Sequence, residues 1–175
     1  SLHDALPIYI DFREKEDNVP YSELAEQGFV EFCDGKLIDQ EQIFHFIEDC
    51  MDFYDVQQVN YDPAMSDRLV EKLENLGLEC IQVDQYARVL NSPLEDTERL
   101  FYEQRIMFDN PLFLYCALNV VVKMDFQGRK VPSKNQSKRK IDGFVAFLCA
   151  HKETMDQMID VNEDDMDDYL DSIYR

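Results

Sequence analysis

The stretch from 56 to 85 constrains the fold most, because two strand-like segments flank a segment with helical periodicity. The first, VQQVNYD, ends at Pro63, and the second is LECIQVDQ. Between them, SDRLVEKLENLG has Ser66 as a helix N-cap and Gly77 as a C-terminal stop. A strand, a helix and a strand in this order predict a parallel pair joined by a right-handed crossover. We therefore predict an α/β fold with a mixed sheet flanked by helices.

Three upstream segments have recognisable patterns. DQEQIFHFIEDCMDFY places apolar residues at helical spacing over 41–54, and Asp39 can cap it, so we predict a helix that belongs to the core. GFVEFCDGKLID predicts two short strands or a hairpin around Asp34 and Gly35. Asp11 lies in IYIDFR, a plausible strand.

Downstream, SPLEDTERLFYEQR predicts a helix with Ser92 as N-cap and Pro93 at its first position. The segment 110–125, NPLFLYCALNVVVKMD, is apolar almost throughout. We predict that it is buried, begins as a helix and continues as a strand in its Val-rich part. A basic loop follows, and then a helix over about 140–157.

Composition divides the chain into three parts. We interpret 1–8, SLHDALPI, as a leader of non-native origin and exclude it from the fold prediction. Residues 9–158 form the predicted folded domain. Residues 159–175 form an acidic tail, which we interpret as solubilising or as binding a partner.

The distribution of charge limits the nucleic-acid interactions available to this chain. A formal net charge of −20 argues against broad, non-specific binding, because such binding is mostly phosphate neutralisation. However, residues 128–140 hold six of the 17 basic residues and no acid, whereas 153–171 hold nine acids and no base. A local basic patch can act on DNA even when the whole protein is acidic.

Several other classes are disfavoured. The five cysteines are odd in number and form no CxxC pair, which is typical of reduced thiols in the cytoplasm. No apolar run approaches the roughly 18 residues needed to span a bilayer. Neither GxxxxGKS/T nor GxGxxG occurs, so this chain holds no phosphate-loop motor.

Two aspartates stand at the ends of predicted elements. Asp62, in VNYDP, lies where a buried strand leaves the sheet, and ligands of open α/β sheets gather at such ends. Asp142, in RKIDGF, lies at the start of a helix, where free amides stabilise a carboxylate. Converging carboxylates of this kind can hold Mg²⁺ or Mn²⁺. Taken singly, an aspartate such as Asp62 before proline is usually a turn residue, and one such as Asp142 at a helix start is usually a cap.

The loop before Asp142 is the strongest concentration of positive charge. It is either a solvated surface loop or a phosphate-binding loop, whose cations are Lys134, Lys138, Arg139 and Lys140. Asn119, on an otherwise apolar segment, is either a hydrogen-bonded core residue or a residue that supports the site.

An ordered set of short motifs favours the functional interpretation of these residues. YDP, SPLEDTERL, DNP followed by Asn119, KMD, a lysine loop and KIDG occur in this order and spacing. From about Val19 to His151, the chain resembles the nuclease domain of the large terminase subunit of tailed bacteriophages. That resemblance implies an RNase H-like fold and an Mg²⁺- or Mn²⁺-dependent endonuclease that cleaves concatemeric double-stranded viral DNA during packaging.

The resemblance also implies roles for individual residues. Asp62 matches the second catalytic, metal-binding acid, and Asp142 matches the acid that opens the late helix; the family holds two divalent cations there. Lys134 and Lys138 match the DNA-binding basic loop, whose contacts to phosphate position the strand. Asn119 and Asp125 match supporting positions. The implied partners are viral DNA, a portal protein, a small terminase subunit and an upstream ATPase domain, in the host bacterial cytoplasm.

The chain departs from the family pattern at its beginning. The family's first catalytic aspartate lies on the first sheet strand, well upstream of DNVPY, and no residue here matches it. Asp11 is at the wrong place relative to that motif. We therefore expect a nuclease domain truncated at its N-terminus, without the first strand and one metal ligand, so that this fragment binds metal weakly or is inactive.

Two alternatives remain open. Another RNase H-like nuclease, of the resolvase or transposase type, would share the carboxylate chemistry. A non-catalytic binding module would instead use its acidic surface to dock on a portal protein or small terminase subunit.

Overall fold

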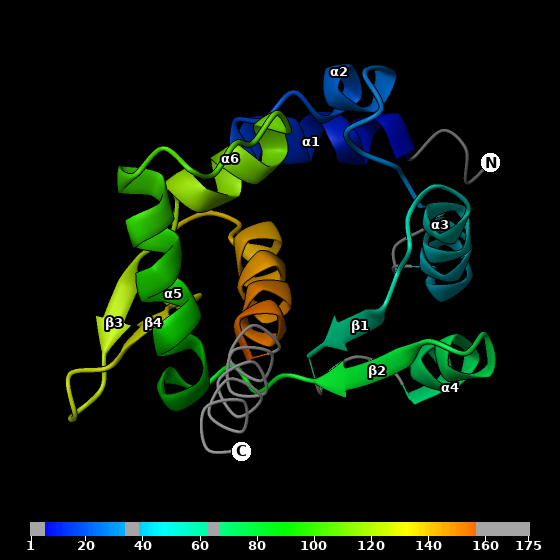
Figure 1. Cartoon of the computed structure of the whole chain (residues 1–175). Helices are drawn as coiled ribbons and strands as arrows, with labels where there is room; N and C mark the ends of the chain where they lie inside the picture. The colour runs from blue at the N-terminus through cyan, green and yellow to red at the C-terminus, as the bar shows by residue number, and fades with distance from the viewer. Residues whose placement is uncertain (1–5, 34–38, 63–66, 157–175) are drawn as a thin grey trace, which may run out of the picture.

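A computed structural model describes residues 6–33, 39–62 and 67–156. Its labelled elements, in chain order, are α1 (Leu6–Asp17), α2 (Tyr21–Glu26), α3 (Gln40–Phe53), β1 (Gln58–Tyr61), α4 (Asp67–Asn75), β2 (Glu79–Gln82), α5 (Ala87–Tyr102), α6 (Pro111–Leu118), β3 (Val122–Met124) and β4 (Lys130–Pro132). A further helix covers 142–156, the orange helix of Figure 1, and is called the 142–156 helix below.

The predicted strand–helix–strand unit is confirmed. β1 and β2 form a parallel pair whose register runs from Gln58 opposite Glu79 to Tyr61 opposite Gln82. α4 is the crossover between them, and Gly77 ends it with a φ of +90°, a backbone conformation that glycine adopts without a steric penalty. The parallel pair therefore brings the carboxyl end of β1 next to that of β2, where Asp62 follows.

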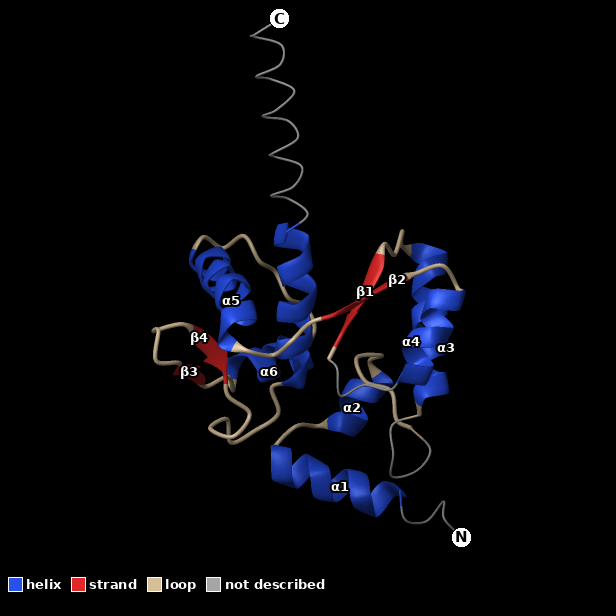
Figure 2. Cartoon of the chain, turned by 90° about the horizontal axis from the view of Figure 1, so that it is seen from below, coloured by secondary structure: helices blue, strands red, loops and turns tan. Residues whose placement is uncertain are grey.

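A second pair of strands lies on the other side of the molecule. β3 and β4 are antiparallel, with Lys123 opposite Val131, so the Val-rich strand predicted after α6 is confirmed. The described strands thus form one parallel and one antiparallel pair, in two separate two-stranded sheets. Figure 2 shows α5 and the β3–β4 hairpin on one side of the 142–156 helix, with β1, β2, α3 and α4 on the other side.

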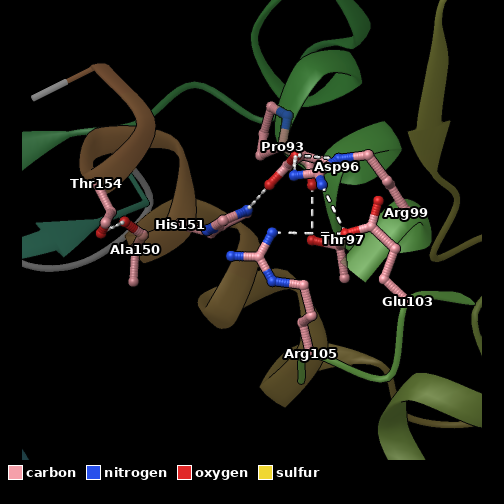
Figure 3. A network of polar contacts seen from close by, with 9 residues as sticks. All are labelled: Pro93, Asp96, Thr97, Arg99, Glu103, Arg105, Ala150, His151 and Thr154. Atoms are coloured by element: carbon pink, nitrogen blue, oxygen red, sulfur yellow. Dashed lines mark hydrogen bonds and ion pairs between the residues drawn. The ribbon is translucent and has the colours of Figure 1, made fainter. Parts of the chain in front are cut away.

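The larger hydrophobic core surrounds the 142–156 helix. That helix packs against α5, α6 and β4, and the buried members of the cluster are Val83, Leu90, Leu94, Cys116, Val131, Ile141, Phe144, Val145, Leu148 and Cys149. Partly buried Phe113 and Phe147 extend it, with ring centroids 5.5 Å apart and nearly perpendicular planes, a favourable aromatic geometry. At its far end, His151 pairs with Asp96 of α5 at 2.9 Å (Figure 3).

The smaller core lies between α3, α4 and the β1–β2 pair. Its buried members are Leu69, Leu73 and Leu78, and α3 adds only partly buried residues. The prediction that 41–54 belongs to the core holds for one face only: Ile43, Phe44 and Ile47 pack against the smaller core, whereas Phe46 and Tyr54 are 57% and 71% exposed. The predicted cap is confirmed: the carboxylate of Asp39 accepts a hydrogen bond from the backbone N–H of Glu41 at 2.9 Å.

α5 begins earlier than predicted. Tyr86 is its N-cap residue, so Ser92 is not a cap and Pro93 lies inside the helix. An internal proline costs about 3 kcal/mol because it removes a backbone hydrogen bond. Burial offsets that cost here: Leu90, in the added turn, and Leu94 are 1% and 3% exposed in the larger core. The burial of this apolar face therefore outweighs the helix-start signal of Ser92 and Pro93.

Three further predictions are corrected or fall outside the description. The segment 110–125 is buried only in part: Cys116 is 5% exposed, but Leu118 and Met124 are 77% and 66% exposed. Asp11 lies in helix α1, not in a strand. Residues 29–33 form no strand, and the predicted hairpin turn at 34–35 lies outside the described residues. Within the described ranges, no helix combines the length and apolarity required for a membrane span.

Candidate functional site

Asp62 directly follows β1, at the carboxyl end of the parallel pair. The backbone N–H of Val83 donates to the carbonyl of Tyr61 at 2.9 Å, so the segment after β2 stays beside the end of β1. Two residues after Val83, the Gln85 side-chain amide donates a hydrogen bond to the Asp62 carboxylate. Asp62 is half-buried and is oriented by its neighbouring strand segment.

Asp142 is the first residue of the 142–156 helix, as the sequence predicted to within two residues. Its side chain is 65% exposed, and the Lys134 ammonium lies 2.9 Å from its Oδ1. Gly143 follows at a close approach to α6: a Cβ there would lie 3.4 Å from the Cys116 sulfur. The start of the helix is thus seated on α6 while Asp142 faces outward.

Asp62, Asp142 and Lys134 line one cavity of about 520 Å³, called the carboxylate cavity below, together with Gln85. Its other walls are mostly apolar and come from α3, α4, β1 and the 142–156 helix. Burial raises the pKa of the Cys149 thiol in this wall, and the nearby charge of Asp62 raises it further. The two aspartates, 80 positions apart in the sequence, therefore reach the same cavity from different cores.

The basic loop has a rigid base. Ser137 is buried, and its Oγ accepts a hydrogen bond from the backbone N–H of Val121 at 3.0 Å. The Ser137 backbone N–H donates to the carbonyl of Ser133 at 2.9 Å, closing a turn. The turn begins at Ser133, directly after β4, and places Lys134 at the carboxylate cavity.

The remaining cations of the loop line a neighbouring cavity of about 370 Å³, called the loop cavity. Lys134 and Asp142 belong to both cavities, and Lys138, Arg139 and Lys140 belong to the loop cavity. Arg139 also donates a hydrogen bond to the carbonyl of Asp17 at 3.0 Å. It therefore fastens the C-terminal end of α1 to the loop.

Asn119 and Asp125, which the resemblance assigned to supporting roles, make local contacts. The Asn119 amide donates to the carbonyl of Tyr115 at 2.7 Å, at the end of α6. The Asp125 carboxylate accepts from the backbone N–H of Gln127 at 2.8 Å and pairs with Arg129 at 2.7 Å, which closes the β3–β4 turn. Neither residue is among those that line the carboxylate cavity.

The donor set in the carboxylate cavity suits a hard cation. Asp62 and Asp142 offer carboxylate oxygens, and the side-chain amide of Gln85 lies beside them. Mg²⁺ is commonly held by one or two carboxylates plus substrate phosphates, so these groups fit one such ion. Across 6–33, 39–62 and 67–156, no group of three or more His, Cys, Asp or Glu residues is arranged to hold a metal.

Two cavity residues were missed by sequence reasoning. Gln85 ends the second strand-like segment, and the rule that pointed to Asp62 at a strand end applies equally to it. Asn60, on β1, donates its side-chain amide to the carbonyl of Cys149 at 3.2 Å. No sequence signal marks that contact, because it joins residues 89 positions apart.

Two known proteins are similar to this chain in sequence. The chain is 22% identical to the large terminase subunit of Enterobacteria phage HK97, over 81% of this chain and 29% of that protein. It is 26% identical to Protein YmfN of Escherichia coli (strain K12), over 87% of this chain and 33% of that protein. It therefore spans about a third of the length of these relatives.

A solved structure carries the same fold. The crystal structure of the HK97 bacteriophage large terminase matches with a TM-score of 0.75 and 22% sequence identity, over 82% of this chain and 31% of that one. The match confirms the predicted fold class and is consistent with the RNase H-like architecture. The family model for the terminase large subunit, endonuclease domain, matches residues 9–157. The chain therefore belongs to the family of terminase large subunit endonuclease domains.

Proposed function

We propose that this domain is an Mg²⁺- or Mn²⁺-dependent DNA endonuclease that cleaves concatemeric double-stranded viral DNA during genome packaging, with Asp62 and Asp142 as its catalytic, metal-binding acids. The observation that supports this most is their shared cavity, which Lys134 also lines. Two carboxylates and one cation, delivered by three separate chain segments, suit a phosphodiester held by charge.

The acidic and basic residues of the carboxylate cavity would have different roles. A bound divalent cation would supply positive charge that stabilises the oxygens of the phosphodiester transition state. Asp62, oriented by Gln85, and Asp142, at the helix start, would hold that cation against a DNA phosphate. Lys134 neutralises Asp142 in the absence of DNA and would turn to the phosphate when the cation arrives.

A pair of cations, which the family resemblance implies, needs more carboxylates than the described residues bring together. We propose that the second cation depends on a further acid, supplied by the longer protein of which this domain is a part. Lys138, Arg139 and Lys140 would bind DNA phosphates beside the cavity, and Asn119 and Asp125 would support the site from a distance. Portal protein, small terminase subunit and an ATPase domain are the proposed partners, in the host bacterial cytoplasm.

The test is cleavage of supercoiled plasmid with Mn²⁺, with and without chelator, by this chain and by a version extended with upstream genomic sequence. Chelator-sensitive cutting by the extended protein supports the proposal. In that protein, Asp142→Asn should abolish cutting with little change in Tm, because the ion pair with Lys134 that it removes is largely exposed. Asp109→Asn, at an exposed position outside the cavity, is the matched control.

Three results would contradict the proposal. Cutting that survives Asp142→Asn would remove that residue from the catalytic site. No cutting by either protein, with both folded, would favour the non-catalytic module that docks on a packaging partner. Preferential cutting of branched DNA would instead indicate a nuclease of the resolvase type.

A further inference from the structure

A third cavity, of about 730 Å³, opens between the start of α5 and the β3–β4 hairpin, and is called the hairpin cavity. Gln85 lines both this cavity and the carboxylate cavity. Lys134 and Asp142 in turn join the carboxylate cavity to the loop cavity. The carboxylate cavity, which Asp62 lines, therefore shares lining residues with each of the other two cavities.

The hairpin cavity is positive in a strongly acidic chain. Three cations line it, Arg88, Lys123 and Arg129, against a single carboxylate, Asp125. Asp125 pairs with Arg129 at 2.7 Å, so Arg88 and Lys123 are the two cations that no carboxylate of the cavity lining balances. The formal net charge of the chain is −20, so this excess is a local feature of the surface.

The Arg88 side chain is exposed and makes weak contacts with its neighbours. Its guanidinium carbon lies 5.7 Å from the centre of the Tyr86 ring, a distance at which a cation is attracted to the ring face. Its ion pair with Asp84 is long, at 3.8 Å, and its side chain is 65% exposed. Lys123 lies on β3 and is also exposed. Both side chains can reach an anion without breaking a tight contact.

We propose that the hairpin cavity is a second phosphate-binding surface for duplex DNA, placed across the carboxylates from the basic loop. Its occupant is the sugar-phosphate backbone on the far side of the cleavage point, contacted by Arg88 and Lys123. The duplex then lies over all three hollows and is held on both flanks of Asp62 and Asp142. This inference rests on the proposed nuclease function and adds the second half of its DNA path.

The chemistry of the surface favours DNA backbone over an acidic protein. The cations are spread over the start of α5 and β3, with a hollow between them, as a continuous backbone requires. Contacts of this kind position a duplex and read no bases. Each phosphate contact contributes about 0.9 to the slope of log Kobs against log salt concentration, so the contacts can be counted.

The experiment measures binding, separately from cleavage. A short fluorescent duplex is titrated with this chain in EDTA at several salt concentrations, and anisotropy gives Kd and its salt slope. The test variant is Arg88→Ala with Lys123→Ala. The control is Arg105→Ala, because Arg105 is also 65% exposed, has a carboxylate at 3.5 Å and lines none of the three cavities.

The double alanine variant should weaken binding roughly 10-fold or more at low salt and reduce the salt slope by about two, one unit for each lost contact. Arg88→Lys with Lys123→Arg should restore both values, because the charges return. The control should bind as the unchanged chain does. Circular dichroism should be the same for all of them, since the substituted side chains are exposed.

Two outcomes separate this inference from the nuclease proposal. If Lys134→Ala with Lys138→Ala weakens binding but the Arg88 and Lys123 variant does not, the hairpin surface is overturned and the proposed function is untouched. If plasmid cleavage fails in the extended protein but the hairpin variant still lowers the salt slope, the DNA surface stands without the nuclease. Equal binding by every variant overturns the inference.

Discussion

The two proposed catalytic aspartates stand on cores of unequal size. Asp142 opens a helix that supplies four of the ten buried residues of the larger core, and the other six come from α5, α6, β4, Val83 after β2 and Ile141 just before the helix. Asp62 follows a strand whose core holds three buried leucines, with an α3 that buries none of its residues. Among the described residues, β1 pairs with one strand, β2, and its other edge has no strand partner. We therefore expect the region around Asp142 to be the more stable of the two. The region around Asp62 has fewer buried residues to hold it in place.

This difference has a consequence for function. Metal binding needs the two carboxylates at a fixed separation, and that separation is only as stable as the weaker core. Regions with few buried apolar contacts open locally at a lower free energy than well-packed ones. A contact that fixes β1 would thus improve metal binding without touching either aspartate.

The largest expected effects come from removing a buried leucine in each core. Leu148 is 0% exposed and Leu73 is 2% exposed. Leu148→Ala should lower the free energy of unfolding by about 3–4 kcal/mol, and Leu73→Ala by about 2–3 kcal/mol, because the smaller core can close around the lost volume. Urea denaturation measures both. A larger loss for Leu73→Ala would reverse the comparison.

Hydrogen exchange tests the same contrast in the unchanged protein. Amides of β1 and α4 should exchange through openings at least about 1 kcal/mol easier than those of the 142–156 helix, since fewer buried groups hold them. The helical amides of α4 are the better probe, because the helix type is then matched. Equal protection in both helices would mean that the two cores unfold as one unit.

Asn60 links the two halves. Its side-chain amide donates to the carbonyl of Cys149, and its own carbonyl accepts from the Gln58 side chain at 2.8 Å. Asn60→Ala should cost about 1 kcal/mol of unfolding free energy, the usual value for a half-buried hydrogen bond, and should make β1 exchange faster. Asn75→Ala, exposed at the end of α4, is the control and should change little. Unaltered exchange of β1 would remove Asn60 as the link.

Ion pairs of Asp96 should also make the stability of the larger core depend on pH. Arg99 and then His151 hold the pKa of the Asp96 carboxyl below its ordinary value (Figure 3). A depressed carboxyl pKa stabilises the fold above the unfolded value, and this stability is lost as pH falls through the folded value. Asp96→Asn should therefore cost about 1 kcal/mol at pH 7 and much less at about pH 3. A cost independent of pH would argue against the ion pairs as its cause.

The smallest expected effect is at Gly143. An added Cβ would meet the Cys116 sulfur at 3.4 Å, whereas alanine is better than glycine in a helix by up to about 1 kcal/mol. The two terms oppose each other, so Gly143→Ala should change the free energy of unfolding by less than about 1 kcal/mol. In a Cys116→Ala background the contact is removed, and the same substitution should then be stabilising. Thermal denaturation of the four proteins measures this coupling.

Particular residues show why some features could be predicted. Asp62 and Asp142 were found because strand ends and helix starts are readable from local pattern, and both positions were confirmed as element ends. Gln85 was equally readable but carries no charge to draw attention. Asn60 was not readable, because its partner lies far away in sequence. The error over α3 has a related cause: periodicity identifies an apolar face but not whether another element covers it.

The sequence by itself determined the parallel strand–helix–strand unit, the caps at Asp39 and Gly77, and the concentration of cations before Asp142. These depend on neighbours within one or two turns. Tertiary structure decided that α5 passes through Pro93, that Lys134 meets Asp142, and that Asp62 and Asp142 line one cavity. Such features depend on burial and charge shared between segments far apart in the chain, and no local pattern carries the free energy that settles them.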